Sequence, residues 1–188
     1  MGKTSLFFYL VIFIVMVILT GCLNTQDLAI NNKDNGNSQQ DLENDVITIP
    51  PFNLEDIYQN IVSNDIFSDY KLTLVNIWAV GDQNCAEELP YLQEIYTELK
   101  DQSINVIGII AGGEKDDAIQ VLNKRNITYT NIIPDERLFD FILEIAPAVP
   151  TSLLVDNTGH SLTKPIVGAR TKKEFSRLIN DTIKLIEQ

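Results

Sequence analysis

The stretch LTLVNIWAVGDQNCAEELP, residues 72–90, decides the fold of this chain. Its first part, Leu72 to Trp78, is rich in β-branched and apolar residues, as expected of a strand covered on both faces. Its second part opens a helix that we expect from Cys85 to Leu99. Apolar residues recur there at helical spacing, and two glutamates occupy the first turn, where the helix dipole favours anions. The polar residues between strand and helix are therefore the first candidates for a functional site.

Strand-like and helix-like segments alternate along the rest of residues 46–188, which indicates an α/β domain. We expect strands at 105–110, 152–155 and 161–167, and helices at 114–124, 138–145 and 171–186. The sequence DNTG at 156–159 is a turn signal, so the last two strands should form a hairpin. A chain of 188 residues accommodates one such domain with extra segments, but not two full domains with separate cores.

The N-terminus carries a targeting segment. Lys3 supplies a positive charge before the apolar run Leu6 to Leu19, and this run is shorter than the roughly 20 residues that cross a bilayer as a helix. The sequence LTGC at 19–22 resembles a bacterial lipobox, in which the cysteine receives a diacylglyceryl group and the peptide is cut before it. We expect residues 1–21 to be a lipoprotein signal peptide. Cys22 would then be the lipidated N-terminus of a protein held at the extracytoplasmic face of the bacterial cell membrane.

Residues 22–45 are expected to form a disordered tether, because Asn, Gln, Asp and Ser dominate them and no apolar period occurs. The formal net charge of the whole chain is −12. This acidity excludes nucleic acid as a partner, since phosphate binding depends on clustered Lys and Arg. It also opposes adsorption to anionic lipids, so membrane attachment should come from the lipid on Cys22.

The chain contains two cysteines and one histidine. Because lipidation uses Cys22, Cys85 is the single thiol expected in the mature protein, and no intramolecular disulfide can form. Cys85 is then either a buried, inert side chain or a thiol available to an outside partner. His160 follows the expected turn and should be solvated, and one histidine without clustered cysteines or paired carboxylates makes no metal site. We expect neither a metal nor another cofactor.

The order of elements is that of the thioredoxin fold: strand, active-site turn, helix, strand, helix, X-Pro, hairpin and terminal helix. Residues 75–79 and 85–90 resemble the active-site region of the TlpA/ResA-like thioredoxins, membrane-tethered bacterial redoxins of the alkyl hydroperoxide reductase and thioredoxin superfamily. The resemblance extends from about Phe52 to the C-terminus, and residues 149–151 match the family's cis-proline segment. It implies a thioredoxin-like α/β fold with a central mixed β-sheet flanked by helices. It also implies a thiol-disulfide oxidoreductase that acts on client protein thiols or disulfides.

The family's reactive motif is Cys-x-x-Cys, and the same window reads DQNC at 82–85 here. Asp82 stands at the place of the first, attacking cysteine, and Cys85 matches the second, resolving cysteine. Asp82 is either an N-cap that accepts a hydrogen bond at the start of the helix or a proton acceptor for Cys85 or a client thiol. The helix dipole lowers the pKa of Cys85 and the neighbouring carboxylates raise it, and the sequence leaves the balance open.

The resemblance also implies a substrate-binding surface beside this motif. Trp78 is expected to pack at its floor more than to contact a ligand directly, and the cis-proline segment would pair with an extended client peptide. The remaining residues assigned to the surface are Val149, Pro150 and Thr151, with Glu88 and Pro90 in supporting positions.

Two functions of different classes remain open. As an enzyme, the protein would form a mixed disulfide between Cys85 and a client, and an external thiol would complete turnover. As a binding module, it would keep the fold and the peptide groove and recruit a client or a cell-envelope protein partner without redox turnover. The retained cysteine favours the first function and the missing nucleophile the second.

Overall fold

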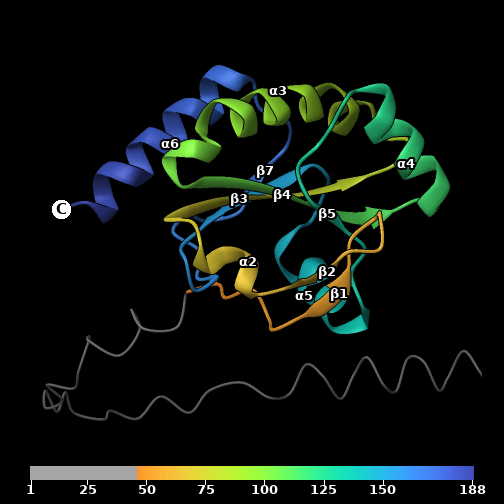
Figure 1. The fold of residues 1–188 in the computed structure, drawn as a ribbon, viewed down its shortest axis with the longest axis horizontal. Coiled ribbons are helices and arrows are strands. Elements are labelled where there is room, and N and C mark those ends of the chain that lie inside the picture. The colour runs from red at the N-terminus through yellow and green to blue at the C-terminus, as the bar shows by residue number, and fades with distance from the viewer. Residues whose placement is uncertain (1–45) are drawn as a thin grey trace, which may run out of the picture. The chain divides into compact units, whose positions relative to one another are not determined.

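The computed structural model describes residues 46–188, and the expected signal peptide and tether lie outside the described residues. A five-stranded sheet with the order β5-β4-β3-β6-β7 forms the centre of the domain (Figure 1). The pairs β3–β4 and β4–β5 are parallel, and the pairs β3–β6 and β6–β7 are antiparallel. The mixed sheet confirms the expected fold class. Its strands are β3 (Leu72–Ala79), β4 (Ile104–Gly112), β5 (Asn131–Ile132), β6 (Thr151–Val155) and β7 (Ile166–Val167).

Helices cover both faces of the sheet (Figure 1). The helices α3, α4 and α6 lie on one face, and α2 and α5 lie on the other. Their bounds are α2 (Asp65–Ser68), α3 (Gln83–Leu99), α4 (Lys115–Lys124), α5 (Glu136–Ile145) and α6 (Lys172–Ile186), and a short 3-10 turn, η1 (Lys100–Gln102), follows α3. No helix within residues 46–188 is both long enough and apolar enough to span a bilayer.

The alternation of strand faces divides the core into two clusters. Leu74 and Trp78 of β3 point to the α3 side, whereas Val75 and Ile77 point to the α5 side. Strand β3 is buried from Leu72 to Trp78, which explains why its sequence is a nearly continuous apolar run rather than an alternating one. Because both faces of β3 are covered, the end of this strand is a fixed platform for the loop that follows.

The expected hairpin strand at 161–167 is only partly present. Ser161 bridges Val155, and β7 pairs with β6 at Ile166 and Val167, while the chain from Thr163 to Pro165 leaves the ladder. The Oγ1 atom of Thr163 accepts the N–H of Leu154 at 3.3 Å. In a regular hairpin a backbone carbonyl would accept this N–H. Pro165 has no N–H to donate, and the prediction of one continuous strand was therefore wrong.

Residues 50–70, for which no element was predicted, contain α2 and a two-stranded sheet of β1 (Asn53–Glu55) and β2 (Ile61–Ser63). Strands of three residues are too short to show a periodic pattern. Their connection depends on Asp56, whose Oδ1 accepts the N–H groups of Tyr58 at 2.8 Å and Asn60 at 2.9 Å. A buried side chain, rather than strand propensity, therefore stabilises this turn.

Candidate functional site at the start of helix α3

The loop between β3 and α3 is held at both of its ends. Val80 donates its N–H to the carbonyl of Gly112 at 2.9 Å, which joins the loop to the end of β4. Gly81 has a φ of 85°, a left-handed conformation that favours glycine. Asp82 follows in an extended conformation and is the N-cap of α3. Its Oδ1 accepts the N–H of Cys85 at 2.8 Å, which confirms the expected capping role.

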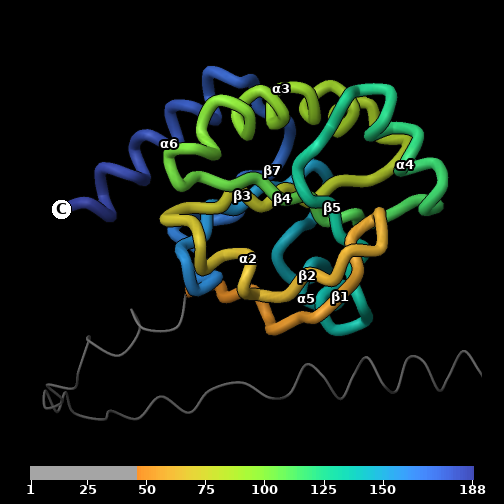
Figure 2. The backbone as a smooth tube through the Cα atoms, in the orientation of Figure 1, coloured from red at the N-terminus to blue at the C-terminus, as the bar shows by residue number. Residues whose placement is uncertain are grey.

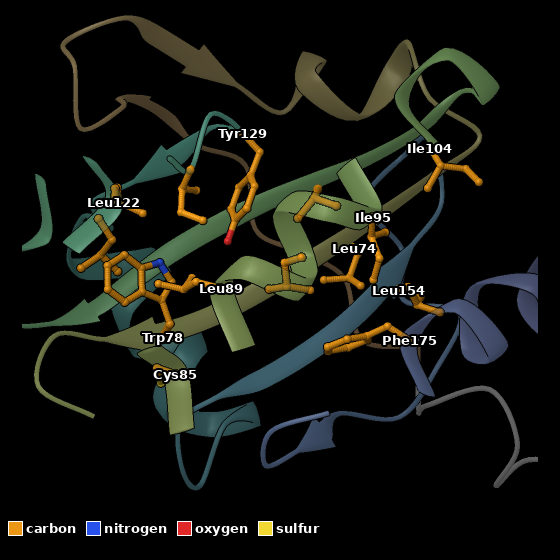
Figure 3. Close-up of a cluster of buried hydrophobic side chains, with 14 of the residues drawn as sticks. Leu74, Trp78, Cys85, Leu89, Ile95, Ile104, Leu122, Tyr129, Leu154 and Phe175 are labelled. Carbon is orange, nitrogen blue, oxygen red and sulfur yellow. The ribbon is translucent and has the colours of Figure 1, made fainter. Parts of the chain in front are cut away.

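Cys85 lies in the first turn of α3 and points into the core. It is 1% exposed and belongs to the same apolar cluster as Trp78 and Leu89, with Cys85 and Trp78 at the same end of the cluster (Figure 3). Burial raises the pKa of the Cys85 thiol to about 12, and the carboxylates of Asp82 and Glu88 add to this rise, while the N–H of Ala79 opposes it. Burial is the largest cause of this shift and acts in the same direction as the acidic neighbours, so the thiol is neutral at neutral pH.

Glu88 lies one turn further along α3 and is also 1% exposed. Its Oε2 accepts the side-chain amide of Asn76 at 2.9 Å, and its Oε1 accepts the N–H of Arg170 at 2.8 Å. Burial raises the pKa of Glu88 to about 7, and the hydrogen bonds from Arg170 and Asn76 act in the opposite direction. The residue therefore changes its protonation state near neutral pH.

Asn76 joins Glu88 to the neighbouring strand. Its amide nitrogen also donates to the hydroxyl of Ser152 at 3.1 Å, and its Oδ1 is buried without a protein partner. Neither Asn76 nor Arg170 was among the residues predicted for the site. A signal existed for Asn76, because an amide in an apolar strand must find buried partners. Arg170 gave no comparable signal, since it contributes its backbone N–H from 82 residues further along the chain.

Trp78 forms the floor of the site. Its side chain is 1% exposed, and its Nε1 donates to the Oδ1 of Asn131 at 2.9 Å. Asn131 in turn donates to the carbonyl of Tyr129 at 2.9 Å. Trp78 is thus a packing residue beneath the site, and its indole N–H donates to Asn131 within the domain.

Pro150 directly precedes β6 and lies near the end of β3. The Val149–Pro150 peptide bond is cis. Thr151 pairs with Ile77 in the antiparallel register of β6 and β3, so Pro150 comes level with Trp78, one residue before the end of β3. The carbonyl of Pro150 accepts the N–H of Gly168 at 2.8 Å. Val149 is half-buried, whereas Thr151 is fully buried and donates its hydroxyl to the carbonyl of Ala148 at 2.6 Å.

Pro90 lies inside α3 and has no N–H to donate to the carbonyl of Ala86, four residues earlier. Arg125, at the end of α4, donates its Nε to that carbonyl at 2.8 Å. Pro90 was among the residues predicted for the site, whereas Arg125 was not. The two partners are 39 residues apart, and no local pattern links them.

His160 is exposed, as expected, and its Nδ1 faces the hydroxyl of Thr158 in the turn after β6. Within residues 46–188, no group of three or more His, Cys, Asp or Glu side chains is placed to hold a metal ion. The polar chemistry of the site therefore rests on Asp82, Cys85 and Glu88.

Comparisons with known proteins show the family and the fold. The family model described as "AhpC/TSA family" matches residues 47–161. A thiol-disulfide oxidoreductase ResA of Geobacillus kaustophilus is 26% identical over 132 residues, which cover 69% of this chain and 73% of the relative. A ResA of Oceanobacillus iheyensis is 23% identical over 137 residues, covering 70% and 69% of the two chains.

Solved structures share the fold. A thiol:disulfide interchange protein of the thioredoxin family from Chlorobium tepidum has a TM-score of 0.65 at 19% identity, covering 73% of this chain and 96% of that chain. StoA from Bacillus subtilis has a TM-score of 0.56 at 17% identity, covering 69% and 96%. The fold of this chain is thioredoxin-like, and the relatives that it resembles are ResA thiol-disulfide oxidoreductases. Because the family model spans more than half of its residues, the chain belongs to the AhpC/TSA family.

Proposed function

We propose that this protein is a lipid-anchored, extracytoplasmic redoxin that binds client proteins of thiol-disulfide exchange and does not complete dithiol turnover by itself. The observation that carries the proposal is the state of the Asp82–Cys85 segment. The position of the attacking thiolate is occupied by a capping carboxylate, and the remaining thiol is 1% exposed with its pKa raised to about 12. A buried neutral thiol is a poor nucleophile at neutral pH.

The client surface is proposed to lie between the N-terminus of α3 and the segment Val149 to Thr151. Pro150 comes level with the end of β3, and its neighbour Val149 is half-buried, so part of its side chain can contact a partner. Trp78 supports this surface from below, while Glu88 and Pro90 shape the helix beside it. Recognition through backbone and apolar contacts does not require a reactive thiol.

The proposed anchor is the lipid on Cys22, after removal of residues 1–21, with residues 22–45 as the tether and 46–188 as the client-binding domain. A thiol-disulfide function outside the cytoplasm fits this arrangement, because disulfide bonds persist in oxidising compartments. The membrane contact would thus be covalent, and the acidic chain itself would contribute no attraction to anionic lipids.

A second function, a one-cysteine oxidoreductase, is supported by the carboxylate of Asp82 beside the Cys85 thiol. In that reaction Asp82 accepts the thiol proton, and the Cys85 thiolate attacks one sulfur of a client disulfide. A mixed disulfide forms and the client's other sulfur leaves as a thiolate. An external thiol then attacks the mixed disulfide, releases Cys85, and becomes disulfide-bonded to the client. This cycle requires Cys85 to become exposed.

Alkylation of Cys85 separates the two functions. The full chain, purified in detergent, is treated with iodoacetamide at pH 7.5, and the label is quantified on the peptide that contains Cys85. We expect labelling at least about a hundredfold slower than that of a free cysteine, because burial and the raised pKa both lower the exposed thiolate fraction. Labelling as fast as a free cysteine would overturn the binding proposal and favour the one-cysteine enzyme, because it would show an exposed thiolate.

The variant Asp82→Cys tests whether the surrounding site is still that of a redoxin. It restores the Cys-x-x-Cys spacing at the same helix end, and we expect it to reduce insulin in the presence of dithiothreitol well above the wild-type rate. Gln83→Cys is the matched control, since it introduces the same second thiol away from the N-cap position. Equal activity of the two variants would show that the site provides no environment for exchange.

A further inference from the structure

Pro90 leaves a gap in the hydrogen bonding of α3. In a regular helix the N–H of residue 90 would donate to the carbonyl of residue 86, and proline has no N–H. The affected carbonyl belongs to Ala86, which directly follows Cys85 in the first turn of the helix. This turn also contains the N-cap bond from Cys85 to Asp82, so a local defect here bears on the residues of the site.

Arg125 fills this gap from another element. It is the C-terminal cap residue of α4, and its Nε donates to the carbonyl of Ala86 at 2.8 Å. The bond places the end of α4 beside the first turns of α3, and Figure 2 shows the two segments next to each other. The guanidinium is half-buried, which makes the hydrogen bond stronger than a fully solvated one.

The first turn of α3 is therefore held from two directions. At the N-terminal end of the turn, the side chain of Asp82 accepts the N–H of Cys85. The backbone carbonyl of Asp82 accepts the N–H of Ala86 at 3.1 Å. Arg125 holds the carbonyl side of the same residue, Ala86. If this turn opens, the Cys85 side chain leaves the apolar cluster that it shares with Trp78.

We propose that Arg125 is a positioning residue that keeps the first turn of α3 closed and thereby sets how often the Cys85 thiol is exposed. This inference rests on the proposed function, in which Cys85 is shielded in the resting protein. Arg125 acts through Ala86 and contacts no client.

The test measures alkylation of Cys85 in the full chain purified in detergent, with Arg125→Met, which removes the donor but keeps most of the apolar length. Loss of a charged donor to a half-buried carbonyl shifts a local opening equilibrium by about tenfold. We expect the alkylation rate of Cys85 to rise by about that factor. Hydrogen exchange of the backbone amides in the first turn of α3 should accelerate in parallel. A global loss of stability would instead accelerate exchange throughout the domain.

Arg137→Met is the matched control. Arg137 also donates to a backbone carbonyl, that of Pro51, but it belongs to α5, which covers the opposite face of the sheet. We expect this variant to leave Cys85 alkylation within about twofold of the wild type. An equal rise in both arginine variants would overturn the proposal, because it would reflect general destabilisation.

The variant Pro90→Ala provides the rescue. It returns an N–H to position 90, so the carbonyl of Ala86 gains a partner within the helix and no longer depends on Arg125. We expect Arg125→Met to change alkylation by less than about twofold in this background. An unchanged tenfold effect would overturn the proposal. Rapid labelling of the wild type would instead contradict the proposed function, so the two failures are distinguishable.

Discussion

The carboxylate of Asp82 accepts the backbone N–H of Cys85 at 2.8 Å, so the two ends of the Asp-x-x-Cys segment are joined by a hydrogen bond. In a Cys-x-x-Cys protein the same two positions exchange between a dithiol and a disulfide. Here the contact is a helix cap, and it has no oxidised form. The segment thus keeps its structural role at the helix start while the second thiol lies in the core.

Asp82 should contribute to stability through its acceptor oxygen and to the pKa of Cys85 through its charge. Asp82→Ala removes both, and we expect it to lower the free energy of unfolding by about 1 kcal/mol. Asp82→Asn keeps an acceptor, so it should lose only a small part of this stability while still lowering the pKa of the Cys85 thiol. Urea unfolding and the pH dependence of alkylation measure the two effects. Equal destabilisation by both substitutions would contradict the capping role.

Glu88 should make the protein less stable as the pH rises toward neutral. Its pKa is raised to about 7 by burial, above the value of about 4.3 for an unfolded chain. Between these two values the folded state retains a proton that the unfolded state releases, so stability falls with increasing pH by at most about 1.4 kcal/mol per pH unit. The contribution of Glu88 to the free energy of unfolding is fully present below about pH 4, and its loss is complete above about pH 7.

The variant Glu88→Gln isolates this effect, because glutamine is nearly isosteric and does not titrate. Urea unfolding at several pH values from 4 to 8 should show a decline for the wild type that the variant lacks. The difference between the two curves reports Glu88 alone, since all other titrating groups are shared. Parallel curves over this range would show that the pKa of Glu88 is the same in the folded and unfolded states, and would contradict the shift.

Gly108 should be essential for the floor of the site. A Cβ at this position would collide with the side chain of Asn131 and would come within 3.0 Å of the Nε1 of Trp78. We expect Gly108→Ala to break the Trp78–Asn131 hydrogen bond and to lower stability by about 2 kcal/mol or more. Trp78 is the single tryptophan, so its fluorescence reports the change directly.

Gly112→Ala is the control for this substitution, because a Cβ there would meet only the Cβ of Ala79 at 3.5 Å, an ordinary contact. It lies in the same strand, β4, and carries the same intrinsic effect of replacing glycine. We expect it to change stability by less than about 1 kcal/mol. Similar losses for both variants would contradict the role assigned to Gly108.

Cys22 should be the site of lipid attachment. Cys22→Ala removes the acceptor of the diacylglyceryl group, and we expect loss of fatty-acid labelling and altered processing of the precursor. Metabolic labelling with a radioactive fatty acid, followed by immunoprecipitation, measures this directly. A Cys85→Ala protein serves as the control and should be labelled like the wild type. Labelled Cys22→Ala protein would contradict the proposed anchor.

The sequence alone determined the central elements of the domain and the place of its site. The apolar run at 72–78 predicted the buried strand β3, and the helical spacing that follows predicted α3 to within two residues of its start. These patterns are local: a strand buried on both faces requires continuous apolar residues, and a helix covering a sheet requires an apolar stripe. The capping role of Asp82 was accessible for the same reason, since its partner is three residues away.

Only the tertiary structure decided how the site behaves chemically. The pKa of Cys85 depends on burial beneath α3, and that burial is produced by side chains from several elements. Arg125 reaches Ala86 across 39 residues, Asn131 reaches Trp78 across 53, and Arg170 reaches Glu88 across 82. No periodic pattern encodes such pairs, because their proximity arises when the sheet brings distant segments together. The desolvation that neutralises the thiol is likewise a property of the packed core rather than of any single segment.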